Sequence, residues 1–487
     1  TGAFLILSSP ARVTVPSMQT SPLVFSKAGF QIQVSCQNPP AAEICFFHIV
    51  LLYRNHIKKK SKFLTHPPDS GIIELIFLSL YHYSPPKEVG VFSTEKKIKK
   101  SHLSGGIHMS KNEKAKVYFT DFHTIAFGDG LPAKLKKLIR KAGIGSIDMD
   151  GKFVAIKMHF GELGNISYLR PNYAKAVVDV IKELGGKPFL TDCNTMYPGS
   201  RKNALEHLEC AWENGFTPLT VGCPIIIGDG LKGTDDIAVP VAGGEYIKEA
   251  KIGRAVMDAD VFISLTHFKG HEMTGFGGTI KNIGMGCGSR AGKTDQHSSG
   301  KPHVKEKLCR GCRRCQKECA NGGLVFDEAS RKMHVDSEHC VGCGRCLGAC
   351  NFDAIEFDNN AANELLNCRM AEYTKAVVDG RPNFHISLVV DVSPNCDCHG
   401  ENDVPILPNL GMFASFDPLA LDQACVDACL AAAPMPGSQL AKHLADPDFH
   451  DHHDHFTNST PESEWKSCLA HAEKIGLGSR EYELITL

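Results

Sequence analysis

From about residue 115 onward, short apolar runs alternate with longer segments in which apolar residues recur every three or four positions. The runs KVYF, FVAIKM and KPFL predict strands, and each precedes a segment with helical periodicity, the first being LPAKLKKLIRKAG. The runs CPIII and DVFISL follow, and after an interruption the pattern resumes with NELLNCRMAEYTKAVVDG, FHISLVVDV, GMFASF and PLALDQACVDACLAAA. Strands that alternate with helices are typical of a sheet covered by helices on both faces. We therefore predict a three-layer α/β domain with an open sheet.

Residues 301–358 interrupt this alternation and carry a different pattern. They contain two runs of four cysteines, and the second run begins 31 residues after the first. Each run is followed by a short apolar segment that predicts a strand, LVF in the first repeat and AIEF in the second. Because the helix and strand pattern continues on both sides, we predict one discontinuous α/β domain, residues 109–300 and 359–487, into which an α+β domain is inserted.

The eight cysteines of the insertion have the spacing C-x-x-C-x-x-C-x-x-x-C in both runs, CRGCRRCQKECA and CVGCGRCLGACN. Three closely spaced thiolates bind one face of a four-iron cluster, while the fourth ligand comes from a more distant part of the chain. The alternative is a zinc module, but zinc sites use two pairs of cysteines rather than two runs of four. The spacing therefore predicts two [4Fe-4S] clusters.

This segment resembles the bacterial two-[4Fe-4S] ferredoxin domain over about residues 301–358. In that family the fourth cysteine of each run ligates the cluster of the other run. The chain has Ala320 and Asn351 where proline usually follows the fourth cysteine, a departure that bears on loop stiffness and reduction potential rather than on ligation. The resemblance implies one cluster held by Cys309, Cys312, Cys315 and Cys350, and a second held by Cys340, Cys343, Cys346 and Cys319.

Residues 1–108 show no sustained period of either kind. Apolar stretches such as ICFFHIVLLY stand beside basic ones such as IKKKSK without caps or turns that would combine them into a fold, and none reaches the roughly 18 residues of a membrane-spanning helix. Codons for the Ser-Gly-Gly that precedes Met109 can spell a ribosome-binding site. We therefore interpret residues 1–108 as translated upstream sequence and expect the protein to begin at Met109. The alternative is a disordered basic arm.

Composition and charge agree with this division. The 487 residues are 43% hydrophobic and 22% charged, as in ordinary globular proteins, and the formal net charge is −1. Residues 1–108 hold 12 basic and 5 acidic residues, whereas the rest of the chain holds 41 and 49. Twenty cysteines without a secretory signal indicate metal binding in a reduced compartment, so we expect a cytoplasmic, anaerobic setting with no nucleic-acid or membrane partner.

Unusual polar residues stand at or just after four predicted strands. In an open α/β sheet, ligands bind outside the carboxyl ends of the strands, so these residues are expected to line one pocket. Each also has a simpler explanation, because a histidine can be a hydrogen-bonded loop residue, a cysteine a buried apolar residue, and an aspartate or asparagine a cap. The residues, strand by strand, are Lys157, His159 and Glu162; Asp192, Cys193 and Asn194; His267, Lys269 and His271; and Asp391, Cys396, Cys398 and His399.

A glycine-rich stretch, GFGGTIKNIGMG, follows the third of these strands. Gly275, Gly277 and Gly278 allow backbone N–H groups to approach an anion, and Lys281 falls in the first turn of the following helix. The spacing matches neither the P-loop nor the dinucleotide-binding motif, and close helix packing explains the glycines nearly as well. We predict a small anionic substrate, or an additional metal or anionic cofactor, in this pocket. The predicted catalytic residues are Lys281, His267, His271, Lys157 and His159, and the predicted cofactor-binding residues are the three glycines, Lys281, Asp192 and Asn194.

From Met109 to its end the chain is identified as a member of the domain-of-unknown-function 362 family. The characteristic segments are AIKMHFGE, FKGHEMTGFGGTIKNIGMG, DVSPNCDCHGENDVPILPNLG and ASFDPLALDQACVDAC. Membership implies an α/β protein that binds iron–sulfur clusters, and it implies no established reaction. The stretch HEMTGFGGTIK also resembles a segment of lactate racemase that holds a nickel-pincer nucleotide, with His271, Gly275, Gly278 and Lys281 as the matching residues.

Two further groups carry metal-ligating residue types. The run FHDHHDHF contains His450, His452, His453 and His455 between aspartates, which favours a solvated loop with incidental metal affinity over a metal site. Cys425 and Cys429 share one face of a predicted helix, either as core residues or as additions to a site.

The leading functional hypothesis is an iron–sulfur redox protein, as in an oxidoreductase, whose two clusters exchange electrons with a site in the α/β domain. Its partner is then a redox protein or a small anionic substrate. One alternative is a ferredoxin-like electron carrier whose α/β domain docks a partner enzyme. The other is a non-redox, metal-cofactor-dependent enzyme in which the clusters are structural.

Overall fold

The computed structural model describes residues 114–487 except 198, 298–300, 320, 341–344 and 358–362. Within the first 113 residues it describes only three strands, which form an antiparallel sheet. These strands belong to a unit of their own, Thr1–Lys97, and Ile98–Leu487 form a second unit. Apart from the strands, the upstream segment predicted over residues 1–108 lies outside the described residues. The strands are β1 (Val24–Lys27), β2 (Phe30–Ser35) and β3 (His48–Leu52).

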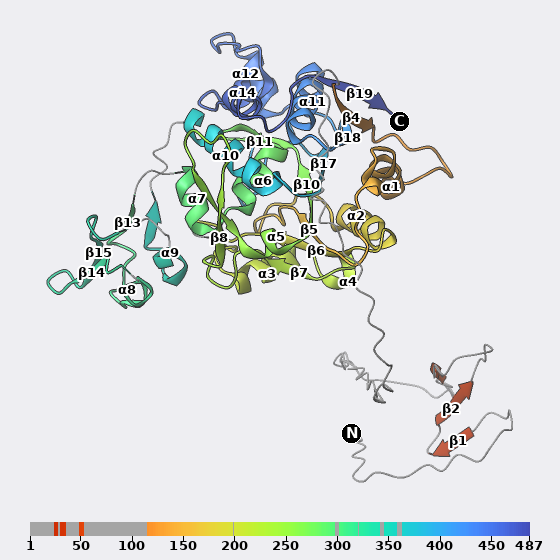
Figure 1. The fold of residues 1–487 in the computed structure, drawn as a ribbon, viewed down its shortest axis with the longest axis horizontal. Helices are drawn as coiled ribbons and strands as arrows, with labels where there is room; N and C mark the ends of the chain where they lie inside the picture. Colours follow the sequence, from red (N-terminus) through yellow and green to blue (C-terminus); the bar gives the residue numbers. More distant parts are fainter. Residues whose placement is uncertain are drawn as a thin grey trace, which may run out of the picture. The chain divides into compact units, whose positions relative to one another are not determined.

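The second unit is built on an eight-stranded sheet with the strand order β19-β4-β18-β17-β10-β5-β6-β7. Seven strands run in one direction and β18 runs against them. The carboxyl ends of β6, β5, β10 and β17, which are neighbours, therefore meet at one edge (Figure 1). The strands are β4 (Ala115–Thr120), β5 (Phe153–Lys157), β6 (Lys187–Asp192), β7 (Ile225–Ile227), β10 (Val261–His267), β17 (Asn383–Val389), β18 (Gly411–Ser415) and β19 (Tyr482–Thr486).

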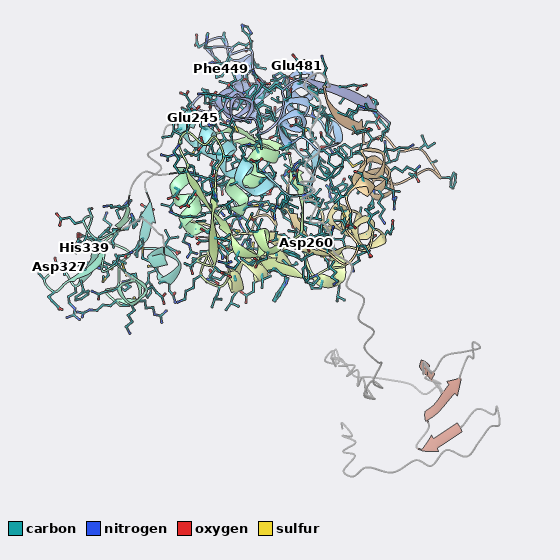
Figure 2. The ribbon with its side chains drawn as sticks, in the orientation of Figure 1. Glu245, Asp260, Asp327, His339, Phe449 and Glu481 are labelled. Atoms are coloured by element: carbon teal, nitrogen blue, oxygen red, sulfur yellow. The ribbon has the colours of Figure 1, made fainter. Side chains whose placement is uncertain are left out.

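Each face of the sheet packs into its own hydrophobic core. Alternate strand residues enter opposite cores, as a pleated strand requires: Val154 and Ile156 lie in one and Ala155 in the other. Helices α1 (Leu131–Lys141), α2 (Pro171–Glu183), α3 (Ala204–Glu213) and α4 (Pro218–Val221) cover the first face. Side chains fill the space between sheet and helices (Figure 2). The predicted α/β fold with an open sheet is confirmed.

The second face is covered mainly by α6, α10 and α11. Helix α6 lies close to α10, because a Cβ atom at Gly284 would come within 2.2 Å of the Met370 carbonyl oxygen. This close packing holds α6 beside the carboxyl ends of the strands. The helices of this side are α5 (Arg254–Asp258), α6 (Thr279–Cys287), α7 (Arg290–His297), α10 (Asn363–Val378), α11 (Pro418–Ala431), α12 (Gln439–Ala445), α13 (His455–Ser459) and α14 (Lys466–Lys474).

Smaller elements complete the α/β domain. A 3₁₀ helix, η1 (Ile144–Ser146), follows α1, and two hairpins lie outside the main sheet. The first hairpin pairs β8 (Asp236–Pro240) with β9 (Glu249–Gly253). The second pairs β11 (Lys269–His271) with β12 (Gly275–Gly277) and connects β10 to α6.

The cysteine-rich segment between α7 and α10 has a small core of its own, built from Cys309, Cys315, Cys346 and Cys350 with Leu324, Met333, Ala354 and Ile355. Its chain enters and leaves through two antiparallel strands, β13 (Pro302–Val304) and β16 (Ile355–Phe357). Between them lie α8 (Arg314–Glu318), the hairpin of β14 (Leu324–Asp327) and β15 (Lys332–Val335), and α9 (Arg345–Ala349).

Among the residues that the structure describes, no helix combines the length and the apolar character needed to cross a membrane.

Candidate functional site

A cavity of about 670 Å³ lies at the edge where the four strands end. Its walls come from the segments that follow β5, β6, β10 and β17, together with α6 and α7. This is the position in which open α/β sheets bind ligands. Of the residues singled out in the sequence, those that line the cavity are Lys157, His159, Glu162, Asp192, Cys193, Lys269, His271, Lys281, Cys396, Cys398 and His399.

Lys157 and Asp192 form a buried ion pair at the floor of the cavity. The Lys157 Nζ atom lies 3.1 Å from Asp192 Oδ1 and donates a 2.9 Å hydrogen bond to Asn282 Oδ1 on α6. Burial acts to raise the pKa of Asp192, but the charge of Lys157 and other nearby cations outweighs burial and lowers that pKa. Asp192 is therefore ionised at neutral pH, and the pair fixes α6 to the ends of β5 and β6.

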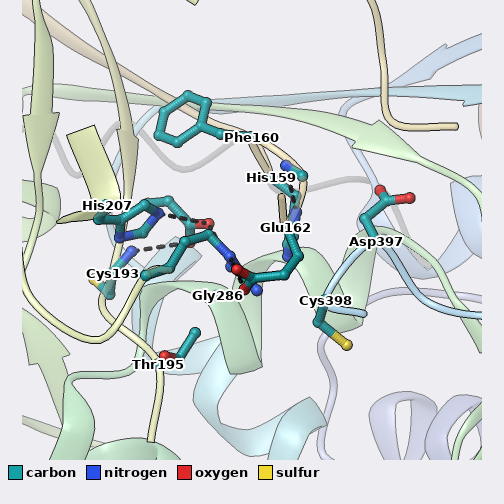
Figure 3. Close-up of polar contacts among 12 residues, drawn as sticks. His159, Phe160, Glu162, Cys193, Thr195, His207, Gly286, Asp397 and Cys398 are labelled. Carbon is teal, nitrogen blue, oxygen red and sulfur yellow. Dashed lines mark hydrogen bonds and ion pairs between the residues drawn. The ribbon is translucent and has the colours of Figure 1, made fainter. Parts of the chain in front are cut away.

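A second buried ion pair joins two residues from the loops after β5 and β6. Arg201 Nε lies 3.0 Å from Glu162 Oε2, and Arg201 Nη2 donates a 2.8 Å hydrogen bond to the Tyr197 hydroxyl. Figure 3 shows Glu162 beside His159 and near Cys398. Arg201 and Tyr197 were not among the predicted site residues. Their position in a loop after a strand end was the available signal, but a single arginine in such a loop is common.

His159 is a neutral hydrogen-bond donor in this setting. Its Nδ1 atom accepts a 2.9 Å hydrogen bond from the backbone N–H of Gly161, so the neutral ring carries its proton on Nε2. Burial, followed by the charge of Arg201, holds the pKa of His159 well below its usual range.

His267 lies behind the cavity wall rather than in it. Its Nε2 donates to the Val390 carbonyl at 2.7 Å, and its Nδ1 lies 2.9 Å from Asp397 Oδ2. Lys269 Nζ lies 3.4 Å from the same carboxylate oxygen. Both nitrogens of His267 are thus engaged by the chain, and the geometry assigns it to holding Asp397, not to catalysis as predicted.

Asp397 is the centre of a turn that presents two cysteines to the cavity. The His399 N–H closes the turn on the Cys396 carbonyl oxygen at 3.1 Å, and Lys281 Nζ lies 3.5 Å from Cys396 Sγ. Donor atoms of His271, Cys396 and Cys398 lie within 4.8 Å of one another, as do those of Glu272, Cys398 and His399. The turn therefore gathers metal-ligating and nucleophilic residue types, together with Lys281, at one end of the cavity.

The glycines of the predicted anion site pack against the chain itself. A Cβ atom at Gly278 would lie 2.5 Å from Asp422 Oδ1, and this carboxylate accepts hydrogen bonds from Thr279 N–H at 2.6 Å and Ile280 N–H at 2.9 Å. Gly275, with φ 67°, lies against Trp465, and Gly277 lies against Lys269. The negative group at the start of α6 is thus the Asp422 carboxylate, and the three glycines pack closely against other parts of the chain.

Two other predicted residues lie away from the cavity. Asn194 donates to Asp229 Oδ1 and to the Gly230 carbonyl, both at 2.8 Å, and so joins two loops. Asp391 forms an ion pair with Arg170 at 3.3 Å. Neither residue lines the main cavity.

In the cysteine-rich segment, four sulfur atoms share one small cavity. It is lined by Cys309, Cys312 and Cys315 from the first run and by Cys350 from the second. Backbone N–H groups point at cysteine sulfurs: Met333 at Cys309 at 3.4 Å, Gly323 at Cys319 at 3.2 Å, and Ala354 at Cys350 at 3.4 Å. Cys343 lies outside the described residues.

This segment also contacts the cavity wall. Glu356 lines the main cavity, and Leu347, next to Cys346, packs on Met196 of the wall. Arg290 is fully buried against Gly348 and donates to the Thr195 carbonyl at 3.3 Å. The residues from Cys346 to Met196 therefore form a continuous packed route to the cavity.

The remaining metal-competent groups are engaged elsewhere. His455 Nε2 faces the Ala432 carbonyl at 2.9 Å, and the rings of His450 and His452 pack against each other with centroids 4.8 Å apart. Cys425 and Cys429 are core residues of α11, and burial raises the pKa of both thiols. Among the described residues, no group of donor atoms close enough to hold a metal ion includes any of these side chains.

Comparison with known proteins gives one family match, to a model described as "Domain of unknown function (DUF362)", over residues 154–427. A thylakoid-associated protein of Synechocystis is 28% identical over 167 residues, which are 32% of this chain and 46% of that protein. The chain thus spans less than half the length of this relative.

Two solved structures are also similar in part. The lactate racemase apoprotein of Thermoanaerobacterium thermosaccharolyticum has a TM-score of 0.29 and 11% identity, over 53% of this chain and 49% of its own. A protein of Thermotoga maritima has a TM-score of 0.32 and 14% identity, over 61% and 57%.

Proposed function

Because the chain belongs to the DUF362 family, whose name specifies no reaction, we propose its function from its own residues. It is an iron–sulfur redox protein in which two [4Fe-4S] clusters, bound by the cysteine-rich segment, exchange electrons with a small anionic molecule in the cavity at the strand ends. The clusters would supply one-electron storage. The chain supplies their ligands, the ligand-binding cavity and the packed route between them.

The observation that carries the proposal is the position of Cys350. It belongs to the second cysteine run, yet it lines the same small cavity as Cys309, Cys312 and Cys315. This is the crossed set of ligands that a two-cluster ferredoxin requires. The backbone N–H groups directed at Cys309, Cys319 and Cys350 also suit thiolate ligands, because such hydrogen bonds stabilise the negative sulfur and tune the potential.

An anionic molecule suits the cavity because two of the five lysine and arginine side chains in its walls lack a carboxylate partner in the part of the chain that the structure describes. Lys157, Arg201 and Lys269 have carboxylate partners within 4.0 Å. Lys281 and Lys293 also line the cavity, and neither has a carboxylate within that distance among the described residues. Buried ammonium groups without a carboxylate favour an incoming anion, which can form charge-assisted hydrogen bonds with them.

The first test is iron and acid-labile sulfide in protein prepared without oxygen. We expect about eight of each per chain, the content of two four-iron clusters, and about half as much iron in Cys309→Ser. Cys223→Ser, a buried cysteine beneath the other face of the sheet, is the matched control. Unchanged iron in Cys309→Ser would exclude the cluster assignment.

The second test asks whether the cavity takes part. The visible absorbance of dithionite-reduced protein is followed after addition of small carboxylates, phosphates or disulfides, for wild type and for Lys281→Met. Substrate-dependent reoxidation that is slowed in Lys281→Met supports the proposal. Reoxidation by a protein acceptor alone favours the docking carrier, and anion binding without any change of the clusters favours the non-redox enzyme.

A further inference from the structure

We propose that Cys396 and Cys398 form a reactive dithiol that reduces a sulfur–sulfur bond held in the cavity. Cys396 is the attacking residue and Cys398 the resolving residue. This site is separate from the cysteines of the inserted segment, and its chemistry does not require them.

The turn that carries the two cysteines is rigid. Its middle residue, Asp397, is completely buried and is held by His267 at 2.9 Å and Lys269 at 3.4 Å. The two Sγ atoms are within 4.8 Å of each other, and both residues line the cavity. A short movement of the side chains can therefore bring the sulfurs to bonding distance while the backbone stays in place.

The surroundings of Cys396 suit a negative sulfur. The ammonium group of Lys281 lies 3.5 Å from Cys396 Sγ, and Lys269 adds a second nearby cation. His271 contributes a donor: its Nδ1 accepts from the N–H groups of Met273 at 3.0 Å and Thr274 at 3.2 Å, so the neutral ring carries its proton on Nε2. His271 Nε2 lies 3.5 Å from Glu272 Oε1, and a ring nitrogen of His271 lies within 4.8 Å of the Cys396 sulfur, whose pKa it helps to lower.

The two thiols differ in acidity as an attacking and a resolving cysteine should. The hydrogen bond from Cys398 holds the pKa of Cys396 well below its usual range, with help from Lys281 and against the effect of burial. The same hydrogen bond raises the pKa of Cys398. By contrast, burial raises the pKa of Cys193, which lines the same cavity. Thiolate character, the basis of reactivity, is therefore concentrated at Cys396.

A metal ion is the competing occupant, because the donor atoms of His271, Cys396 and Cys398 are close enough for a zinc-type site. Two features oppose it. A ligating histidine normally donates its other ring N–H outward, whereas Nδ1 of His271 accepts two N–H groups, so ligation by Nε2 would require an imidazolate. Lys281 would also place an ammonium charge beside the metal. The thiolate is thus neutralised by side-chain cations.

The reaction is balanced by thiol–disulfide exchange. The Cys396 thiolate attacks one sulfur of a disulfide RS–SR, forms Cys396–S–S–R and releases RS⁻. The Cys398 thiol then loses its proton and attacks Cys396 Sγ, which releases the second RS⁻ and leaves a Cys396–Cys398 disulfide. The substrate gains two electrons and the two cysteines lose them, and the one proton, from Cys398, ends on a released thiolate or in solvent. Lys281 and Lys293, which line the cavity without a carboxylate partner among the described residues, favour an anionic disulfide.

The experiment uses the full chain, prepared without oxygen, and the dianionic disulfide 5,5′-dithiobis(2-nitrobenzoate). We expect rapid release of two thionitrobenzoate ions per chain, followed by a Cys396–Cys398 peptide two mass units lighter. Cys398→Ser should release one ion and retain the other on Cys396, and Cys396→Ser should lose the rapid phase. Cys425→Ala, in the core of α11, should behave as wild type.

The uncharged disulfide 4,4′-dithiodipyridine separates attraction by the cavity from thiol reactivity. We expect wild type to react faster with 5,5′-dithiobis(2-nitrobenzoate) than with 4,4′-dithiodipyridine. Lys281→Met should lose this preference for the anionic reagent.

A second measurement follows the rate of alkylation of Cys396 by iodoacetamide between pH 6 and 9. Lys281→Met should shift the pH midpoint of alkylation upward, because the loss of the ammonium group raises the pKa of Cys396, and Lys281→Arg should restore the wild-type midpoint. The charged and titratable groups that interact with the thiol are Lys281, Lys269, His271, Glu272, Cys398, Asp397, His399, His159 and Tyr197.

Three results would overturn the proposal. The first is a rapid phase that survives in Cys396→Ser. The second is release of two ions by Cys398→Ser. The third is a zinc or iron ion, additional to those bound by the inserted segment, that blocks alkylation in wild type and is lost alike in Cys396→Ser, Cys398→Ser and His271→Gln. The metal readout of Cys309→Ser is independent of all three, so failure here does not affect the cluster assignment.

Discussion

The inserted segment and the cavity both gather cysteine sulfurs, but they stabilise them differently. In the insertion, backbone N–H groups approach Cys309, Cys319 and Cys350. In the cavity, the groups around Cys396 are the side chains of Lys281, Lys269 and His271. Backbone donors suit a sulfur whose negative charge a metal would balance, whereas side-chain cations can balance the charge of a thiolate themselves. The first arrangement is encoded by local spacing and the second only by the tertiary fold.

The largest expected effect tests whether the two runs exchange their fourth cysteine. Cys309→Ser with Cys350→Ser should lose no more iron than either change alone, about four of eight atoms, because both residues then serve one cluster. Cys309→Ser with Cys319→Ser should lose nearly all the iron. Iron analysis and electron paramagnetic resonance of the reduced proteins measure this, and the opposite pairing of losses would show that each run binds its own cluster.

The next effect concerns the support of the Cys396 turn. Asp397→Asn removes the carboxylate between His267 and Lys269 and leaves a buried ammonium group unpaired. We expect the free energy of unfolding to fall by about 3–5 kcal/mol. Denaturant titration, followed by the fluorescence of the buried Trp465, measures it. Asp403→Asn, an exposed change in the same loop, should stay within about 0.5 kcal/mol of wild type; equal losses in the two variants would contradict the role of Asp397.

A smaller effect is expected at the start of α6. Gly278→Ala places a methyl group 2.5 Å from Asp422 Oδ1 and disturbs the cap that this carboxylate forms. Overpacking of this kind costs about 1–3 kcal/mol in thermal or denaturant unfolding. At Gly145 the nearest atom is 3.8 Å from the added carbon, so Gly145→Ala should cost nothing. If Gly278→Ala is tolerated, the packing role is wrong, and the glycines are again candidates for binding an anionic ligand.

The smallest effect is a dependence of stability on pH. His385 is a completely buried residue of β17, and burial lowers its pKa to about 3. Below pH 6.5 the unfolded chain binds a proton that the folded chain does not, so stability is present above pH 6.5 and is lost as pH falls toward 3. His385→Gln should lessen the loss of stability between pH 6 and 5 by about 1 kcal/mol. His123→Gln, an exposed change, should leave the slope unaltered.

Much of the fold was predictable because the hydrophobic pattern that marks a strand or a helix lies within one short segment of the sequence. The apolar runs gave seven strands of the main sheet, β4, β5, β6, β7, β10, β17 and β18, but not the two hairpins outside it. The rule that ligands bind at strand ends gave the side of the sheet where Lys157, Asp192 and Lys281 meet. The last strand, β19, was not predicted, since EYELITL lies at the chain end without a following helix to mark it. The cysteine spacing likewise required no knowledge of the fold.

The contacts of several predicted site residues could not be foreseen from the sequence. His267, Asn194 and Gly278 carry residue types that bind ligands, yet each is engaged by a buried aspartate: Asp397, Asp229 and Asp422 respectively. Those aspartates come from segments 35 to 144 residues away, and no local pattern couples them. For the same reason Arg201 and Tyr197 were missed.

The pairing of β13 with β16 has a consequence for how the chain folds. Strands β10 and β17 pair in parallel, with Phe262 opposite Asn383, although the whole insertion lies between them. Pro302 is paired with Phe357, so the two ends of the insertion lie side by side. The insertion therefore adds almost no length to the connection between β10 and β17. The pairing roughly halves the flexible length of the connection between β10 and β17. It lowers the entropic cost of bringing these two strands together by about 0.6 kcal/mol. Joining the two halves of the sheet is therefore nearly independent of the content of the insertion, and the α/β domain is expected to fold at almost the same rate with or without iron.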